Sequence, residues 1–189
     1  MLAFNNLKKG VRIILDADPY EIIEAAPLFK GRGHSVLQAK IKNLITGNVI
    51  SQTFHPSDVF EEAELKKLQA KFLYAHRSQY FFSEIDQLSK RFNLSQSQIG
   101  SQAQFLKPEQ IVDTLIYKGK IVNISLPIKV RLKVVEAPPG VRAGRAEAGT
   151  KQAVLETGAT ISVPLFVKEG DIIEVNTQTG EYVRRVEEH

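Results

Sequence analysis

The residue best suited to bind a charged partner is Arg32, which stands between two glycines in the stretch Lys30-Gly31-Arg32-Gly33-His34. Glycines on both sides permit positive φ angles and a tight turn, so the guanidinium can project from the apex of a hairpin. A projecting arginine binds phosphate or carboxylate groups. The alternative is an ordinary hairpin tip that carries solvated charges, and the local sequence leaves both interpretations open.

No other set of residues has the spacing of a catalytic or metal site. Cysteine is absent, which excludes disulfides, thiolate nucleophiles and cysteine-based zinc sites. The histidines His34, His55, His76 and His189 are scattered without the spacing of metal ligands. Neither a nucleophile elbow nor a phosphate-binding loop occurs. We therefore expect a binding protein that is not an enzyme, with no catalytic residue, metal or cofactor.

The composition is that of a soluble globular protein, with 43% hydrophobic and 24% charged residues among 189. The net charge of +4 originates in residues 64–128, which hold nine Lys/Arg and five Asp/Glu. This excess is compatible with binding RNA, although lysines that only aid solubility would look the same. Neither a signal peptide nor a membrane-spanning run is evident, so we expect a cytoplasmic protein without membrane attachment.

The elements that must position Arg32 are β-strands, which we predict at 11–15, 20–26, 36–44 and 49–54. Residues 36–44 alternate, so that Gln38, Lys40 and Lys42 share one face while Leu37, Ala39 and Ile41 share the other. The first 63 residues thus predict a small barrel with a polar, basic strand face and the Arg32 loop at its tip.

Residues 64–128 predict a five-stranded barrel of the OB type, with strands at 68–74, 79–82, 111–117 and 121–126. Ser83, with Asp86 three residues later, predicts the start of a short helix, and residues 93–104 read as a loop. Four aromatic residues near the first hairpin could stack on bases, although aromatics in paired strands are more often core: Tyr74, Tyr80, Phe81 and Phe82.

Residues 129–189 predict a third small barrel, because short strand-like runs alternate with glycine-containing turns. The runs are 130–135, 153–155, 160–163, 172–176 and 182–186. A loop at 141–150 carries Arg142 and Arg145. The predicted fold is all-β, with three domains at 1–63, 64–128 and 129–189.

Three long stretches closely resemble the carboxy-terminal signature of bacterial elongation factor P: 151–158 (KQAVLETG), 161–167 (ISVPLFV) and 170–182 (GDIIEVNTQTGEY). Shorter matches support the resemblance at Pro19-Tyr20, 40–47 (KIKNLITG), Leu126-Pro127 and 138–141 (PPGV). The likeness covers essentially the whole chain and is weakest between residues 60 and 110.

The resemblance implies an L-shaped, tRNA-like arrangement of a KOW/SH3-like barrel followed by two OB-fold barrels. Members of the elongation factor P and initiation factor 5A family bind the ribosome, 50S and 30S, beside the P-site tRNA and relieve stalling at consecutive prolines. The first-domain tip reaches the CCA end of peptidyl-tRNA, a position that Arg32 occupies here. The face of Gln38, Lys40 and Lys42 is then expected to contact RNA, and the protein to act as a monomer.

Two departures from the family concern these loops. Many members carry a modified lysine at the tip, whereas Arg32 corresponds to the arginine type, which a glycosyltransferase modifies. Members of the arginine type usually have asparagine after the arginine, and this chain has Gly33 instead. Whether Arg32 is modified therefore stays open. In the third domain, the stretch Ala143-Gly144-Arg145, which follows Arg142, replaces the family's Gly-Asp-Thr, which favours phosphate contacts over base contacts.

Three other functions stay open beside the translation factor. An elongation-factor-P-like paralogue would share the fold and the arginine tip but have a different task. A general OB-fold RNA-binding protein would bind free oligonucleotides with a steep salt dependence. An enzyme acting on small substrates is disfavoured by the missing catalytic residues.

Overall fold

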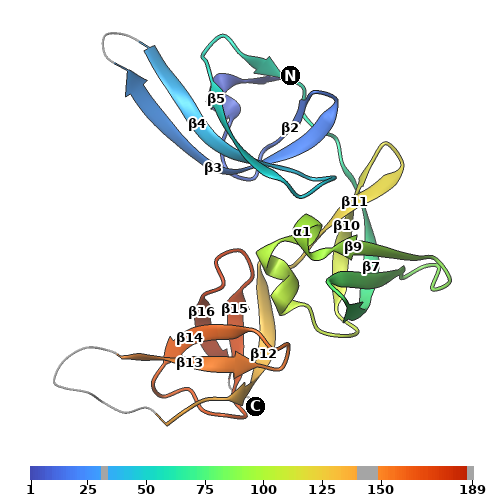
Figure 1. Cartoon of the computed structure of the whole chain (residues 1–189), viewed down its shortest axis with the longest axis vertical. Coiled ribbons are helices and arrows are strands. Elements are labelled where there is room, and N and C mark those ends of the chain that lie inside the picture. The colour runs from blue at the N-terminus through green and yellow to red at the C-terminus, as the bar shows by residue number, and fades with distance from the viewer. Residues whose placement is uncertain (31–33, 140–148, 187–189) are drawn as a thin grey trace. The chain divides into compact units, whose positions relative to one another are not determined.

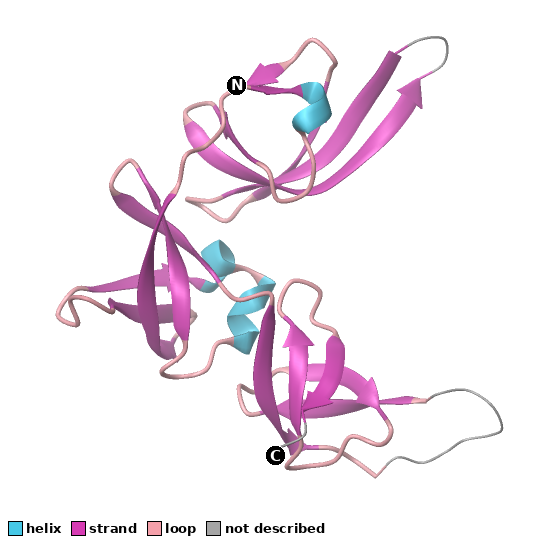
Figure 2. Ribbon diagram, turned by 180° about the vertical axis from the view of Figure 1, so that it is seen from behind, coloured by secondary structure: helices cyan, strands magenta, loops and turns pink. Residues whose placement is uncertain are grey.

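The structure, a computed structural model, describes residues 1–30, 34–139 and 149–186 (Figure 1). Strands dominate these residues, and the helical segments are short (Figure 2). The described residues contain one α-helix, α1 (Gln96–Ile99), and two 3-10 helices, η1 (Phe4–Asn6) and η2 (Ser101–Phe105). The predicted all-β fold is therefore confirmed.

The chain packs into two compact units. Unit 1 comprises residues 1–69, 94–100 and 113–124, and unit 2 comprises residues 70–93, 101–112 and 125–189. The predicted division into three domains, with boundaries at 63/64 and 128/129, stays a prediction.

The first sheet lies in unit 1 and has the strand order β2-β3-β4-β5. Its strands are β2 (Arg12–Leu15), β3 (Asp18–Lys30), β4 (His34–Asn43) and β5 (Val49–Phe54). A separate pair, β1 (Leu2–Ala3) and β6 (Val59–Phe60), lies in the same unit. Asp16 and Ala17 have φ angles of 50° and 69°, which gives the tight turn that joins β2 to β3.

The core of the first sheet follows from strand alternation. The side chains at the centre of this core are at most 1% exposed: Ile13, Ile22, Ile41 and Phe54. In β4, Leu37, Ala39 and Ile41 are buried, whereas Gln38 and Lys40 are exposed and Lys42 is half-buried. The predicted two-faced character of this strand is confirmed.

The second sheet has the order β11-β10-β7-β8-β9, and the division between the units passes through it. Its strands are β7 (Lys66–His76), β8 (Gln79–Glu84), β9 (Arg91–Ser95), β10 (Ile111–Tyr117) and β11 (Lys120–Ser125). All four strands predicted in this region are present, and β9 is an additional strand that begins two residues before the predicted loop.

The prediction that a helix begins at Ser83 is wrong. Ser83 lies within β8, which continues to Glu84, and it is 2% exposed. It therefore does not begin a helix. The helix occurs instead at Gln96–Ile99, inside the predicted loop, where the Ser95 hydroxyl accepts a hydrogen bond from the Gln98 amide at 3.3 Å. Apolar residues at 85, 88 and 92 matched a helical period, but Phe92 belongs to β9 and packs against β8.

The third sheet lies in unit 2 with the order β14-β13-β12-β15-β16. Its strands are β12 (Lys129–Glu136), β13 (Thr150–Leu155), β14 (Thr160–Pro164), β15 (Ile172–Asn176) and β16 (Tyr182–Val186). Leu132, Leu155, Val163 and Ile173 form its fully buried centre. The five strands predicted here are confirmed.

None of the helices in the described part of the chain has the length and apolar character that crossing a membrane would need.

Candidate nucleic-acid interface

The β3–β4 hairpin carries the predicted tip. Its ladder continues through Phe29↔Ser35 to Lys30↔His34, so the backbones of Lys30 and His34 pair directly before the connection. Towards this end Phe29 is 79% exposed, which shows that the hairpin extends beyond the core of the first sheet. Gly31, Arg32 and Gly33 themselves lie outside the described residues. Because Lys30 and His34 are the last paired residues, the connection between β3 and β4 consists of those three residues.

The three polar residues of β4 that were predicted to face RNA differ in their exposure and in their bonding partners. Gln38 is exposed. Lys40 is also exposed, but its Nζ lies 2.9 Å from Oε2 of Glu24 on the neighbouring strand. Lys42 is half-buried, and its Nζ donates to the backbone oxygen of Ile99 at 3.0 Å.

Burial lowers the pKa of Lys42, while the nearby Glu21 carboxylate acts in the opposite direction and raises it. The Lys42 ammonium is therefore partly desolvated and hydrogen-bonded inside unit 1. Of the three residues, Gln38 and Lys40 are those that solvent reaches most readily. An RNA phosphate that approached Lys40 would have to compete with Glu24.

A close packing of the β4–β5 turn on α1 explains the position of Lys42. Gly47 has a φ of +82°, and a Cβ at this position would clash with the backbone oxygen of Ser97. Nε2 of Gln98 donates to the Ile45 oxygen at 2.8 Å, and Nδ2 of Asn123 donates to the Gln98 oxygen at 2.8 Å. No local sequence pattern indicates this packing, because the Gln98 side chain that donates to Ile45 lies 53 positions away along the chain.

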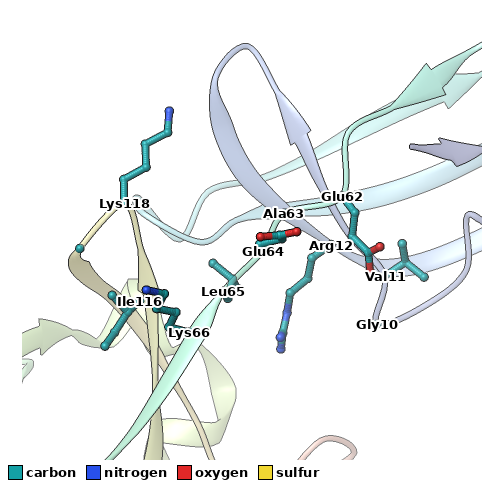
Figure 3. A pocket seen from close by; sticks show the side chains of 11 residues that line it. Gly10, Val11, Arg12, Glu62, Ala63, Glu64, Leu65, Lys66, Ile116 and Lys118 are labelled. Carbon is teal, nitrogen blue, oxygen red and sulfur yellow. The ribbon is translucent and has the colours of Figure 1, made fainter.

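A hollow of about 710 Å³ lies within unit 1 and is lined by segments around residues 10–12, 62–66 and 116–119 (Figure 3). Its lining mixes cations, such as Lys66 and Lys118, with the carboxylates of Glu62 and Glu64. The Lys118 side chain extends away from the other labelled side chains (Figure 3), and Arg12 is paired with Glu21 at 2.8 Å. This mixture of charges favours neither the binding of a polyanion nor a catalytic role for the hollow.

The third-domain loop residues Arg142, Ala143, Gly144 and Arg145 lie outside the described residues. The strand that follows this loop is β13, where Lys151 Nζ donates to the Pro138 oxygen at 2.8 Å. This hydrogen bond joins the two described segments on either side of the loop.

The ion pairs of the third sheet converge on Glu174, which is 7% exposed. Arg184 Nη2 lies 3.3 Å from its Oε2, and Lys129 Nζ lies 3.5 Å from its Oε1. The hydrogen bond from Arg184 is the main reason that the pKa of Glu174 is lowered, with Lys129 adding to the effect. This cluster is structural and carries no group poised for chemistry. No three His, Cys, Asp or Glu side chains of the described ranges lie together as a metal site would need.

Comparison with known proteins identifies the family. The family models "Elongation factor P (EF-P) KOW-like domain" and "Elongation factor P, C-terminal" match residues 3–60 and 130–185. A protein named elongation factor P from Synechococcus sp. (strain JA-3-3Ab) is 38% identical over 185 residues, which cover 98% of this chain and 100% of the relative. The chain belongs to the elongation factor P family.

A second relative named elongation factor P, from Natranaerobius thermophilus, is 37% identical over 186 residues and 98% of both chains. Among solved structures, initiation factor 5A from Methanococcus jannaschii matches 65% of this chain and 94% of its own at 16% identity, with a TM-score of 0.42. Family membership confirms the predicted resemblance and a KOW-like first domain, and it makes the chain a translation factor of the elongation factor P type. The arginine-tip type stays a prediction.

Proposed function

We propose that this protein binds the ribosome beside the P-site tRNA and stimulates peptide-bond formation where consecutive prolines stall translation. The observation that most supports the proposal is the β3–β4 hairpin of an elongation factor P family member, paired as far as Lys30↔His34 and connected through Gly31, Arg32 and Gly33. The exposed end of this hairpin can reach a partner that the core of the sheet cannot.

Arg32 acts as a positioning residue in this proposal. Proline is a constrained nucleophile, and a peptidyl-tRNA that slips out of the reactive pose reacts slowly, so holding its CCA end lowers the entropic part of the barrier. A guanidinium can hold a phosphate through two hydrogen bonds and leave the proton transfer to the ribosome. The protein then needs no catalytic residue or cofactor of its own.

The remaining contacts are with RNA backbone. Gln38 and Lys40 lie on the accessible face of β4 and would contact phosphates or 2′-hydroxyls. Lys42 would contribute mainly by holding β4 on α1, as its bond to Ile99 suggests. In the third domain, Arg142 and Arg145 would contact phosphates near the E-site codon. We place this activity in the cytoplasm, with a monomer that contacts both 50S and 30S subunits and peptidyl-tRNA.

The test is a reconstituted translation reaction that makes a peptide with three consecutive prolines, with and without this protein, beside a proline-free template. Arg32→Ala should abolish the rescue of the proline template, whereas Arg131→Ala, which removes an exposed arginine of β12, should leave it intact. Absence of rescue by protein from its native host, on that host's ribosomes, would contradict the proposal and favour the paralogue.

The modification state of Arg32 is open, and two states are to be distinguished. In one, a glycosyltransferase attaches a sugar to Arg32, as in the arginine type of the family; in the other, the tip is unmodified. Intact-mass spectrometry of the protein from its native host would show a sugar increment above the 21.1 kDa chain. Arg32→Lys should lose that increment if Arg32 carries the sugar, and an unmodified wild-type mass would show that Arg32 carries none.

A further inference from the structure

The outer face of the β7–β8 hairpin carries an exposed aromatic pair in unit 2. The rings of Tyr74 and Phe81 stack with their centroids 4.7 Å apart and their planes at 19°. Tyr74 is 49% exposed, and Phe81 is half-buried beneath it. The pair thus presents a flat aromatic surface to solvent. Phe82, which follows Phe81 in β8, is by contrast fully buried.

A β-bulge places this pair on the outside of the sheet. The register pairs Phe72 with Phe82 and then shifts, so that Tyr74 pairs with Phe81. Phe81 follows the alternation of β8 and faces away from Phe82, and Tyr74 directly opposite it must share that outer face. In an unbroken strand Tyr74 would share the buried face of Phe72, which is 3% exposed.

Polar and basic residues of β9 share the outer face with the pair, and a further arginine lies at the tip of the β7–β8 hairpin. Phe92 of β9 stacks on Phe82 on the core side, so its neighbours Arg91 and Asn93 face outward. Asn93 Nδ2 donates to Oε1 of Gln79, which confirms that the outer faces of β8 and β9 are continuous. Arg77 lies exposed at the tip of the hairpin, where its φ of 48° makes the turn.

The charge of this face is complementary to a polyanion. The sequences of β7, β8 and β9 contain one carboxylate, Glu84, which lies opposite the fully buried Ala70 and so belongs to the other face. Glu109 reaches the far end of the face, where it pairs with Lys71 at 2.7 Å. The ion pairs of the described residues leave Arg77 and Arg91 without a carboxylate partner.

We propose that Tyr74 and Phe81 form a stacking platform for an unpaired base of single-stranded RNA, with Arg77 and Arg91 contacting the phosphates on either side. Aromatic faces and flanking cations are the combination that binds single strands without sequence preference. The choice of RNA as the polyanion rests on the proposed ribosomal function. The platform consists of residues other than those of the Arg32 tip.

The test is the binding of the full-length protein to a fluorescein-labelled twelve-nucleotide oligouridylate, followed by fluorescence anisotropy, with a blunt RNA duplex of equal length as the control. Tyr74→Ala should weaken binding to the single strand by about 5- to 150-fold, which is the range for losing one stacked base. Tyr74→Phe, which keeps the ring, should stay within about twofold of wild type. Arg77→Ala should reduce the dependence of affinity on salt concentration.

The outcomes separate this platform from the Arg32 site. Arg32→Ala should leave oligouridylate binding unchanged, so failure of proline rescue and failure of stacking are distinguishable. Equal affinity of wild type and Tyr74→Ala for the single strand, with both proteins folded by circular dichroism, would overturn the platform. Equal affinity of wild type for the single strand and the duplex would overturn it as well, because a base within a duplex is not free to stack on a side chain.

Discussion

The β3–β4 and β7–β8 hairpins are both antiparallel ribbons with an arginine in the connection, yet they use their polar faces differently. On β4, Lys40 is paired with Glu24 and Lys42 is bonded to the Ile99 oxygen. On the outer face of β7, β8 and β9, an exposed aromatic pair lies near Arg77 and Arg91, which the ion pairs of the described residues leave without a carboxylate partner. The comparison teaches that the number of cations on a strand does not measure the positive charge available to a ligand, because neighbouring strands decide which cations are neutralised.

The strongest test of the comparison is to truncate adjacent aromatic residues of β8. Phe82→Ala removes a fully buried ring and should lower the free energy of unfolding by about 3–5 kcal/mol. Phe81→Ala removes the ring stacked on the exposed Tyr74 and should cost only about 1–2 kcal/mol. Urea unfolding monitored by circular dichroism measures both. Equal losses would show that the outer face is as well packed as the core, which would contradict its assignment as a free surface.

A second test concerns the turn that holds the polar face of the first hairpin. Gly47→Ala should lower the free energy of unfolding by about 2–5 kcal/mol, because it combines a left-handed backbone with a clash against the backbone of Ser97. Gly119→Ala is the matched control, since Gly119 has a similar φ of +78° and nothing within 4 Å of its added Cβ. The control should cost about 1–2 kcal/mol. If both changes cost the same, the packing of this turn on α1 contributes little.

A third test uses the titration of Lys42. Because its pKa is lowered in the folded state, the unfolded chain binds more protons between that lowered pKa and 10.5, and stability should rise with pH across this interval. Lys42→Met loses the bond to Ile99 at every pH but also loses this dependence. The stability difference between wild type and Lys42→Met should therefore grow in favour of wild type on alkalisation, as denaturant titrations at several pH values would show.

Glu21 provides the control for Lys42. Its carboxylate raises the pKa of Lys42 against the effect of burial, so Glu21→Gln should lower that pKa further. Direct NMR titration of the Lys42 side chain would measure the change. An unchanged pKa would show that Glu21 is fully engaged by Arg12, which it contacts at 2.8 Å.

The smallest expected effect is at Glu174 in the third sheet, where a lowered pKa also makes stability rise with pH, but in the acid range. Arg184 and Lys129 favour the ionised carboxylate, so its contribution to stability is present above the ordinary pKa of 4.5 and is lost as pH falls through the lowered value. Glu174→Gln should reduce stability at pH 7 and make it less sensitive to acid. Exposed Glu136→Gln, on neighbouring β12, should change stability by less than about 0.5 kcal/mol. Acid-unfolding curves of the three proteins compare these outcomes.

Local sequence patterns predicted most of the secondary structure of this protein. Period-2 alternation and turn-forming residues located the strands, and the glycines around Arg32 identified the connection between β3 and β4. Two predictions failed. The loop predicted at 93–104 contains the end of β9, α1 and most of η2. The helix predicted at Ser83 rested on only three apolar positions. A short hairpin can match so few positions as well as a helix can.

The sequence by itself determined most of the strands, the faces of regular strands such as β4, and the family. Only the tertiary structure decided which charges are free and which face Tyr74 occupies. Lys42 meets its acceptor 57 positions away, a distance over which no local pattern carries information. The bulge at Tyr74 shifts the register by one residue, and a shift of one residue exchanges the two faces of a strand because its side chains repeat every two residues.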